Sequence, residues 1–125
     1  MEAKAFSSLR HRLQKTQKEM SQLLGVSVRA VQSFDQGWRK VPTSVERQML
    51  FLTALKMRLK RLRPCWEMRG CSLKMRQACP AWEFRVGHLC WFISGTICQG
   101  KAQRSWAQKI KICRKCKVFA ANVGI

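Results

Sequence analysis

The sequence predicts a mainly α-helical chain in two parts, a compact helical bundle followed by a small, irregular, cysteine-rich module. Two observations indicate this division. Up to Pro64, apolar residues recur at helical spacing, with capping residues between the runs. All seven cysteines lie after that proline, between Cys65 and Cys116, where helical periodicity weakens and glycines punctuate the chain. We therefore expect one domain at residues 1–63 and a second at 64–125.

Capping residues mark the first two predicted helices. The first covers residues 7–14, and the second begins after Thr16. Glu19 follows Thr16 by three residues, which is the spacing of a capping box. Gly25 then ends the second helix, because glycine readily adopts the left-handed conformation found after a helix C-terminus. Its expected buried residues are Met20, Leu23 and Leu24.

The third and fourth helices are predicted in the same way. Ser27 is a favourable N-cap for a helix over residues 28–35, and Gly37 ends it. The expected inner face of this helix is made by Ala30, Val31 and Phe34. A longer amphipathic helix is predicted over residues 45–62, and Pro64 stops it. The first domain should therefore be a bundle of four to five helices.

Residues 16–39 carry a recognisable motif, TQKEMSQLLGVSVRAVQSFDQGWR. Its Thr-Gln opening, its Leu-Gly-Val-Ser turn and an acidic residue two positions before a glycine resemble the Cro/C1-type (XRE) helix-turn-helix family. The resemblance covers about residues 6–55, and Asp35 stands where the family usually has glutamate. It implies a repressor-like bundle that binds double-stranded DNA, usually as a homodimer on inverted repeats.

The resemblance also implies which side chains contact DNA. The second helix of the motif enters the major groove, where arginine pairs with guanine and glutamine with adenine. The expected base-contacting positions are Val28, Arg29, Gln32 and Ser33. The expected phosphate contacts are Gln17, Ser27, Arg39 and Lys40. The alternative is that these side chains form an ordinary solvated helix face and a charged loop. We expect Trp38, between these positions, to pack on the domain.

The charge balance favours a polyanionic partner. Lysine and arginine number 25 against 6 acidic residues, which gives a net charge of +19. Nucleic acid is the favoured partner, and an anionic membrane surface is the weaker alternative. No stretch approaches the length of a membrane span, and residues 1–20 lack the apolar core of a signal peptide. We expect a cytoplasmic protein that does not insert into membranes.

Dense cysteine in a cytoplasmic protein favours metal or redox chemistry, because disulfides do not persist in a reducing compartment. The candidate ligands are Cys65, Cys71, Cys79, Cys90, Cys98, Cys113 and Cys116. Only the last two have the Cys-x-x-Cys spacing that lets two thiolates reach one metal from a single turn. The alternatives are ordinary buried thiols and thiol–disulfide switching. We expect His88 to be a structural histidine.

The cysteines and their neighbours from residue 65 to residue 119 occur in the order Cys-Trp-Glu, Cys, Cys-Pro-Ala, Cys-Trp, Gly-Thr-x-Cys and Cys-x-x-Cys. They resemble the two-CW cysteine domain. That module occurs in bacterial signalling and regulatory proteins, so the resemblance implies a regulatory setting. Zinc and an iron–sulfur cluster both accept thiolate ligands. The irregular spacing outside the last pair slightly favours iron–sulfur. We expect tryptophans to shield the site.

Together these features predict a sequence-specific transcription regulator whose cysteine module binds a metal or an iron–sulfur cluster and senses redox state. Two alternatives remain, a regulator whose zinc is purely structural and a protein-interaction or antitoxin-like adaptor. An enzyme is not expected, because the chain has only two histidines and lacks a nucleophile–base set and a glycine-rich phosphate loop. No small-molecule substrate is indicated.

Overall fold

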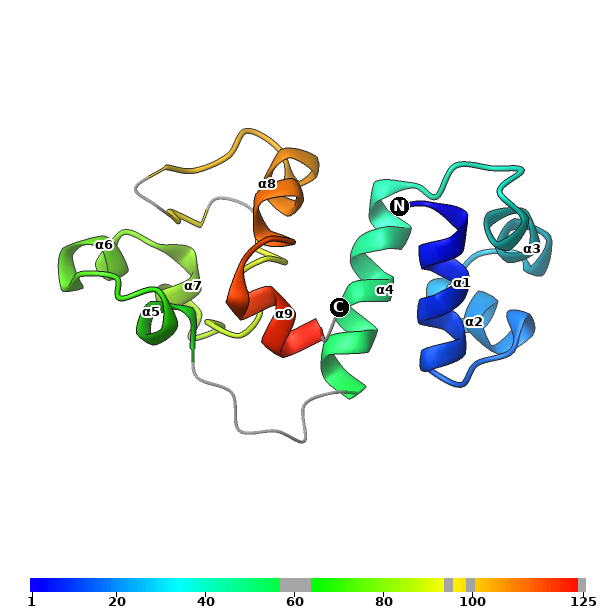
Figure 1. Ribbon diagram of the computed structural model, residues 1–125, viewed down its shortest axis with the longest axis horizontal. Coiled ribbons are helices and arrows are strands. Elements are labelled where there is room, and N and C mark those ends of the chain that lie inside the picture. Colours follow the sequence, from blue (N-terminus) through cyan, green and yellow to red (C-terminus); the bar gives the residue numbers. More distant parts are fainter. Residues whose placement is uncertain (57–63, 94–95, 99–100, 124–125) are drawn as a thin grey trace. The chain divides into compact units, whose positions relative to one another are not determined.

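The computed structural model describes residues 1–56, 64–93, 96–98 and 101–123. Within these ranges the chain is mainly helical and has no β-strand, only an isolated bridge between Cys98 and Lys101 (Figure 1). It divides into two compact units, Met1–Lys56 and Met57–Ile125. The predicted boundary at Pro64 directly follows residues 57–63, which lie outside the described ranges.

The first unit contains the four helices that capping residues predict. They are α1 (Ala3–Arg12), α2 (Gln17–Leu24), α3 (Val28–Gln36) and α4 (Thr43–Lys56). The first helix begins four residues earlier than predicted. The added turn includes Phe6, which is completely buried. The part of the fourth predicted helix at residues 57–62 lies outside the described residues.

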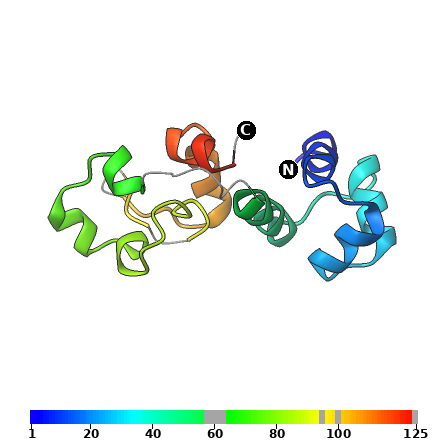
Figure 2. The ribbon, with the colours of Figure 1, turned by 90° about the horizontal axis from the view of Figure 1, so that it is seen from below.

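The core of the first unit is apolar and comes from all four helices. Helix α3 packs against α1 and α2, and α1 also packs against α4 (Figure 2). The rings of Phe6 and Phe34 meet edge to face with their centroids 5.4 Å apart. The other fully or nearly fully buried side chains include Leu9, Met20, Leu24, Val31, Val45, Met49 and Leu50.

One residue predicted to be buried in α2 is exposed. Leu23 has 49% of its surface accessible, whereas Met20 and Leu24 are buried as expected. Ser21 takes the inner position instead, at 5% exposure. Its hydroxyl can be buried because it donates to the carbonyl oxygen of Lys18, 2.6 Å away, one turn earlier in the helix.

The second unit, predicted as a small irregular module, is built from short helices. The helices are α5 (Cys65–Met68), α6 (Leu73–Gln77), α7 (Pro80–Glu83), α8 (Trp106–Cys113) and α9 (Lys117–Val123). Ser72 and Ser105 cap α6 and α8 through their hydroxyl oxygens, and Pro80 opens α7. The described residues between α7 and α8 contain no helix (Figure 1).

Large side chains fill the core of this unit. Trp91 and Phe119 are fully buried or nearly so, and their ring centroids lie 5.5 Å apart. Helix α5 packs against α9, so the beginning and end of the unit meet. The backbone at Gly87 packs closely against the beginning of the unit. A Cβ atom there would lie 2.6 Å from Cβ of Pro64, and the Gly87 carbonyl accepts the amide of Cys65 at 3.0 Å.

Candidate nucleic-acid interface and candidate metal centre

Helix α3 is fixed at both ends and along one side. The Ser27 hydroxyl accepts the amide of Ala30 at 3.1 Å, which caps its N-terminus. Gly25 and Gly37, at φ of 68° and 76°, provide the left-handed residues before and after the helix. The predicted inner face, Ala30, Val31 and Phe34, is buried as expected. The opposite face of α3 is therefore held in one orientation and exposed.

That exposed face carries most of the predicted base-contacting side chains. Arg29 and Gln32 are exposed, and Val28 is 37% exposed. Ser33 is half-buried, and its hydroxyl donates to the carbonyl oxygen of Arg29 at 2.9 Å. An arginine, a glutamine and a valine thus lie within five residues of one helix, where they can meet a hydrogen-bonding and methyl-bearing surface.

The predicted phosphate contact Gln17 takes part in a buried polar network that sequence reasoning missed. Its Nε2 donates to Oδ2 of Asp35 at 2.8 Å. Arg10 approaches the same carboxylate from α1, with Nε and Nη2 each 3.0 Å from Oδ2. The Arg10 and Asp35 side chains are only 11% and 6% exposed. One carboxylate on α3 therefore joins the first three helices, and the acidic residue before Gly37 was its only sequence signal.

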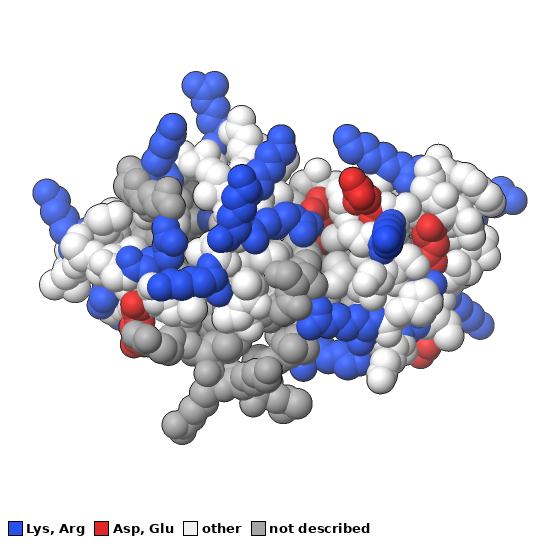
Figure 3. Space-filling model, in the orientation of Figure 1, with Lys and Arg blue, Asp and Glu red and all other residues white. Residues whose placement is uncertain are grey.

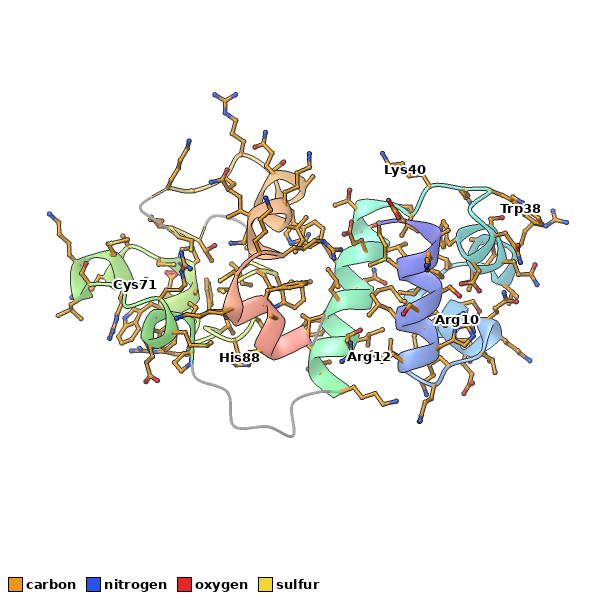
Figure 4. All side chains as sticks on the ribbon, in the orientation of Figure 1. Arg10, Arg12, Trp38, Lys40, Cys71 and His88 are labelled. Atoms are coloured by element: carbon orange, nitrogen blue, oxygen red, sulfur yellow. The ribbon has the colours of Figure 1, made fainter. Side chains whose placement is uncertain are left out.

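The segment between α3 and α4 is exposed and basic. Arg39 and Lys40, both predicted phosphate contacts, are exposed there. Trp38 is 78% exposed, so the expectation that it packs on the domain was wrong. Figure 4 shows Trp38 and Lys40 on this segment, pointing away from the helices. Gly37 is in the left-handed region just before Trp38, and the chain leaves α3 there without returning the ring to the core.

Positive charge extends over much of the molecular surface. In the view of Figure 3, lysine and arginine side chains project from both units and only a few acidic side chains lie between them. The chain's +19 charge is distributed evenly, as +10 over residues 1–63 and +9 over 64–125. Such a surface attracts polyanions from a distance and does so less at high salt.

The cysteines of the second unit surround one cavity of about 370 Å³. All seven predicted ligands line it, although they come from separate segments of the unit: Cys65, Cys71, Cys79, Cys90, Cys98, Cys113 and Cys116. Each of them is half-buried. Figure 4 labels Cys71, close to α5 and α6. His88 is not among the lining residues.

The thiols differ in their tendency to ionise. A hydrogen bond with the Cys90 thiol lowers the pKa of Cys65 to about 7. The same bond, together with burial, raises the pKa of Cys90 strongly. Burial also raises the pKa values of Cys71 and Cys113. The Sγ of Cys79 accepts the amide of Ile97 at 3.4 Å. Among Cys65, Cys71, Cys90 and Cys113, Cys65 is therefore the thiol most easily converted to the thiolate that binds metals.

Lys109 and Thr96 are buried polar residues that also line the cavity, and the sequence did not single them out. Lys109 on α8 is 5% exposed, and its Nζ donates to Oγ1 of Thr96, which is 4% exposed. The Cys90 hydrogen bond and burial have the larger effects on these thiols, but the positive charge of Lys109 adds to the lowered pKa of Cys65 and partly opposes the raised pKa values of Cys90 and Cys113. Trp91 is fully buried, and its Nε1 has no hydrogen-bond partner among the described residues.

The thiols surround a space and do not converge on a point. In the described part of the chain, no three side chains of His, Cys, Asp or Glu are arranged to hold one metal ion. Cys113 ends α8 and Cys116 directly precedes α9, with the Cys116 amide donating to the Cys113 carbonyl at 2.8 Å. This turn brings the predicted Cys-x-x-Cys pair to the cavity wall. Seven thiols and a buried cation fit a thiolate-ligated, anionic metal group.

Comparison with known proteins finds no match for this chain among protein-family models, curated proteins or solved structures.

None of the helices in the described ranges has the length and apolar character required to cross a membrane.

Proposed function

We propose that this protein is a sequence-specific, double-stranded-DNA-binding transcription regulator of the helix-turn-helix type. The observation that carries the proposal is the position of α3. Its inner side is buried against α1 and α2, whereas Val28, Arg29 and Gln32 are exposed on its outer side. A capped helix held in this way can enter a major groove about 12 Å wide.

Each exposed group has a chemical role in this proposal. Arg29 donates two hydrogen bonds to a guanine, Gln32 pairs with an adenine, and Val28 contacts a thymine methyl group. Arg39 and Lys40 bind backbone phosphates from the segment after α3. Phosphate contacts by Gln17 and Ser27 and a base contact by Ser33 are weaker parts of the proposal. Their polar atoms already make hydrogen bonds within the unit.

The predicted homodimer is part of this proposal. Two copies on an inverted repeat would place their α3 helices in successive major grooves on one side of the duplex, one helical turn apart. The net charge of +19 supports fast, salt-dependent association with DNA before the specific sequence is found.

The test is selection of bound sequences from a random double-stranded DNA pool, using the full chain. We expect one enriched motif, arranged as two half-sites. Arg29→Ala and Gln32→Ala should each weaken binding by about 1–3 kcal/mol and relax the preference at one base pair. Lys4→Ala removes an exposed charge from α1 and is the control, because it should leave base preference unchanged. Absence of any enriched motif would contradict the proposal and favour the adaptor.

The second part of the proposal concerns the cysteine unit. We propose that it binds a metal or an iron–sulfur cluster through thiolates of the seven cysteines that line its cavity. Such a group would supply a structural link between the segments and, if it is redox-active, a response to oxidants. The cell signal would then reach transcription through dimerisation or DNA affinity.

This regulatory role is tested by comparing the affinity for the selected DNA of three preparations of the full chain. They are metal-loaded, oxidised and metal-free protein. Different affinities are expected. Equal affinities would eliminate the sensing role and would leave DNA binding and metal binding untouched.

A further inference from the structure

In the part of the chain that the structure describes, Lys109 is a buried cation without an acidic partner. Its side chain donates to a neutral hydroxyl, Oγ1 of Thr96, and both residues are buried. The only acidic residues of the second domain, Glu67 and Glu83, are exposed. A charge removed from water needs a countercharge nearby. The groups at hand are the cavity thiols, three of which lie within reach of its electrostatic field.

Trp91, which lines the same cavity, carries a buried hydrogen-bond donor that lacks an acceptor among the described residues. Its carbonyl oxygen accepts Nε1 of Trp106 at 2.9 Å, which fixes its backbone. Its own Nε1 is buried and has no acceptor among the described residues. Buried N–H groups in folded proteins nearly always have an acceptor. Trp91 and Lys109 both line the cavity, and an unmatched donor together with a buried ammonium favours an occupant that is anionic and carries acceptor atoms.

The spacing of the thiols favours a group larger than one ion. Four thiolates around one zinc lie roughly 3.8 Å from each other, as follows from a tetrahedral Zn–S distance of about 2.3 Å. In the ranges that the structure describes, no three potential ligands are arranged around a single ion. The seven thiols instead line a cavity of about 370 Å³. Iron–sulfur clusters are wider, and their sulfur atoms accept hydrogen bonds.

We propose that the cavity holds a polynuclear iron–sulfur cluster, with the Lys109 ammonium as its countercharge and Trp91 Nε1 as a hydrogen-bond donor to its sulfur. This inference rests on the proposed metal binding and chooses the cluster over zinc. Positive charge and donated hydrogen bonds stabilise the reduced, more negative form of such a cluster. Both residues therefore raise its reduction potential.

The first experiment determines the occupant. Full-length protein is purified without oxygen, treated with Fe²⁺ and sulfide, and compared with a sample given only Zn²⁺. Stoichiometric iron and sulfide with visible absorption are expected. Tight zinc binding without cluster assembly would overturn this inference but leave the proposed metal binding intact. If the protein bound neither iron nor zinc, both this inference and the proposed metal binding would be contradicted. DNA selection would still test the first unit separately.

The second experiment measures the midpoint potential of the assembled cluster. Lys109→Met should lower the potential, and Lys109→Arg should restore most of it because the positive charge returns. Trp91→Phe keeps the ring and removes only the N–H, so it should lower the potential as well and provides an independent test if Lys109→Met does not fold. Lys74→Met, on the exposed side of α6, is the matched control and should not change it. Unchanged potentials in both Lys109→Met and Trp91→Phe would overturn the assigned roles.

Discussion

Replacement of Asp35 by alanine should loosen the first three helices together. The carboxylate accepts hydrogen bonds from Arg10 on α1 and from Gln17 on α2, and all three residues are half-buried. Among the described residues, alanine leaves the Arg10 guanidinium with only its 2.9 Å bond to the carbonyl oxygen of Lys15. The charge then remains in a site where its side chain is 11% exposed.

The size of the effect follows from this geometry. Removing one partner of a buried ion pair costs about 3–5 kcal/mol, and hydrogen bonds to charged groups contribute about 1.5–3 kcal/mol. Because Arg10 retains Lys15 and some solvent, we expect the lower end, about 3 kcal/mol for Asp35→Ala. Asp35→Asn keeps one acceptor oxygen and should cost less. At about 1.4 kcal/mol per factor of ten, 3 kcal/mol corresponds to roughly a 100-fold change in an opening equilibrium.

Hydrogen exchange followed by mass spectrometry of the full chain measures this locally. Peptides from α1 and α3 should exchange about 100-fold faster in Asp35→Ala, in line with the free-energy cost. Glu2→Ala, which removes an exposed carboxylate, is the control and should change exchange little. The double variant Arg10→Met/Asp35→Ala should cost less than the sum of the single variants. Exact additivity, or unchanged exchange in Asp35→Ala, would refute the network.

Four further predictions concern caps, exposure and close packing. Thr16→Ala removes the hydroxyl that accepts the Glu19 amide and should cost about 1 kcal/mol in urea denaturation; an unchanged midpoint would contradict the cap. Hydrogen bonds from Thr16 lower the pKa of Glu19, so the contribution of Glu19 to stability is present above the ordinary carboxyl pKa and is lost as the pH falls through the lowered pKa. The melting-temperature difference between wild type and Glu19→Gln should therefore shrink over that acidic range. A constant difference would contradict this prediction. Trp38→Ala should change stability by less than about 0.5 kcal/mol, whereas Phe6→Ala should cost about 3–5 kcal/mol; similar costs would mean that Trp38 is packed after all. Gly87→Ala should destabilise the second unit by about 1–3 kcal/mol in denaturation followed by tryptophan fluorescence, because its Cβ would meet Pro64 and Trp66; wild-type behaviour would show that this contact relaxes freely.

Local capping chemistry made the first unit predictable. Thr16 and Glu19 form the expected capping box, and Gly25 and Gly37 have the left-handed conformation expected at helix ends. The same approach misplaced Leu23, because apolar character alone gives no weight to a serine that satisfies its own hydroxyl within the helix. The exposure of Trp38 was also misjudged, because it depends on the path of the chain after Gly37.

The second unit was harder to predict because its helices are too short to show periodicity. Ser72, Pro80 and Ser105 were available as helix-start signals, but runs of four to eight residues fall below what spacing can establish. The cavity lining was predictable as far as the cysteines. Lys109 was not, because a lysine on a basic helix is ordinarily solvated, and only the tertiary packing places it beside Thr96.

The contact between α5 and α9 has a consequence for how long the folded protein persists. A group bound jointly by Cys65 and Cys116 would close a loop of about 50 residues, which by the chain-entropy relation disfavours the unfolded state by about 4 kcal/mol. So small a unit has little other reserve of stability. We expect its resistance to proteolysis to follow the supply of that group, so that metal availability would set the amount of folded protein as well as its state.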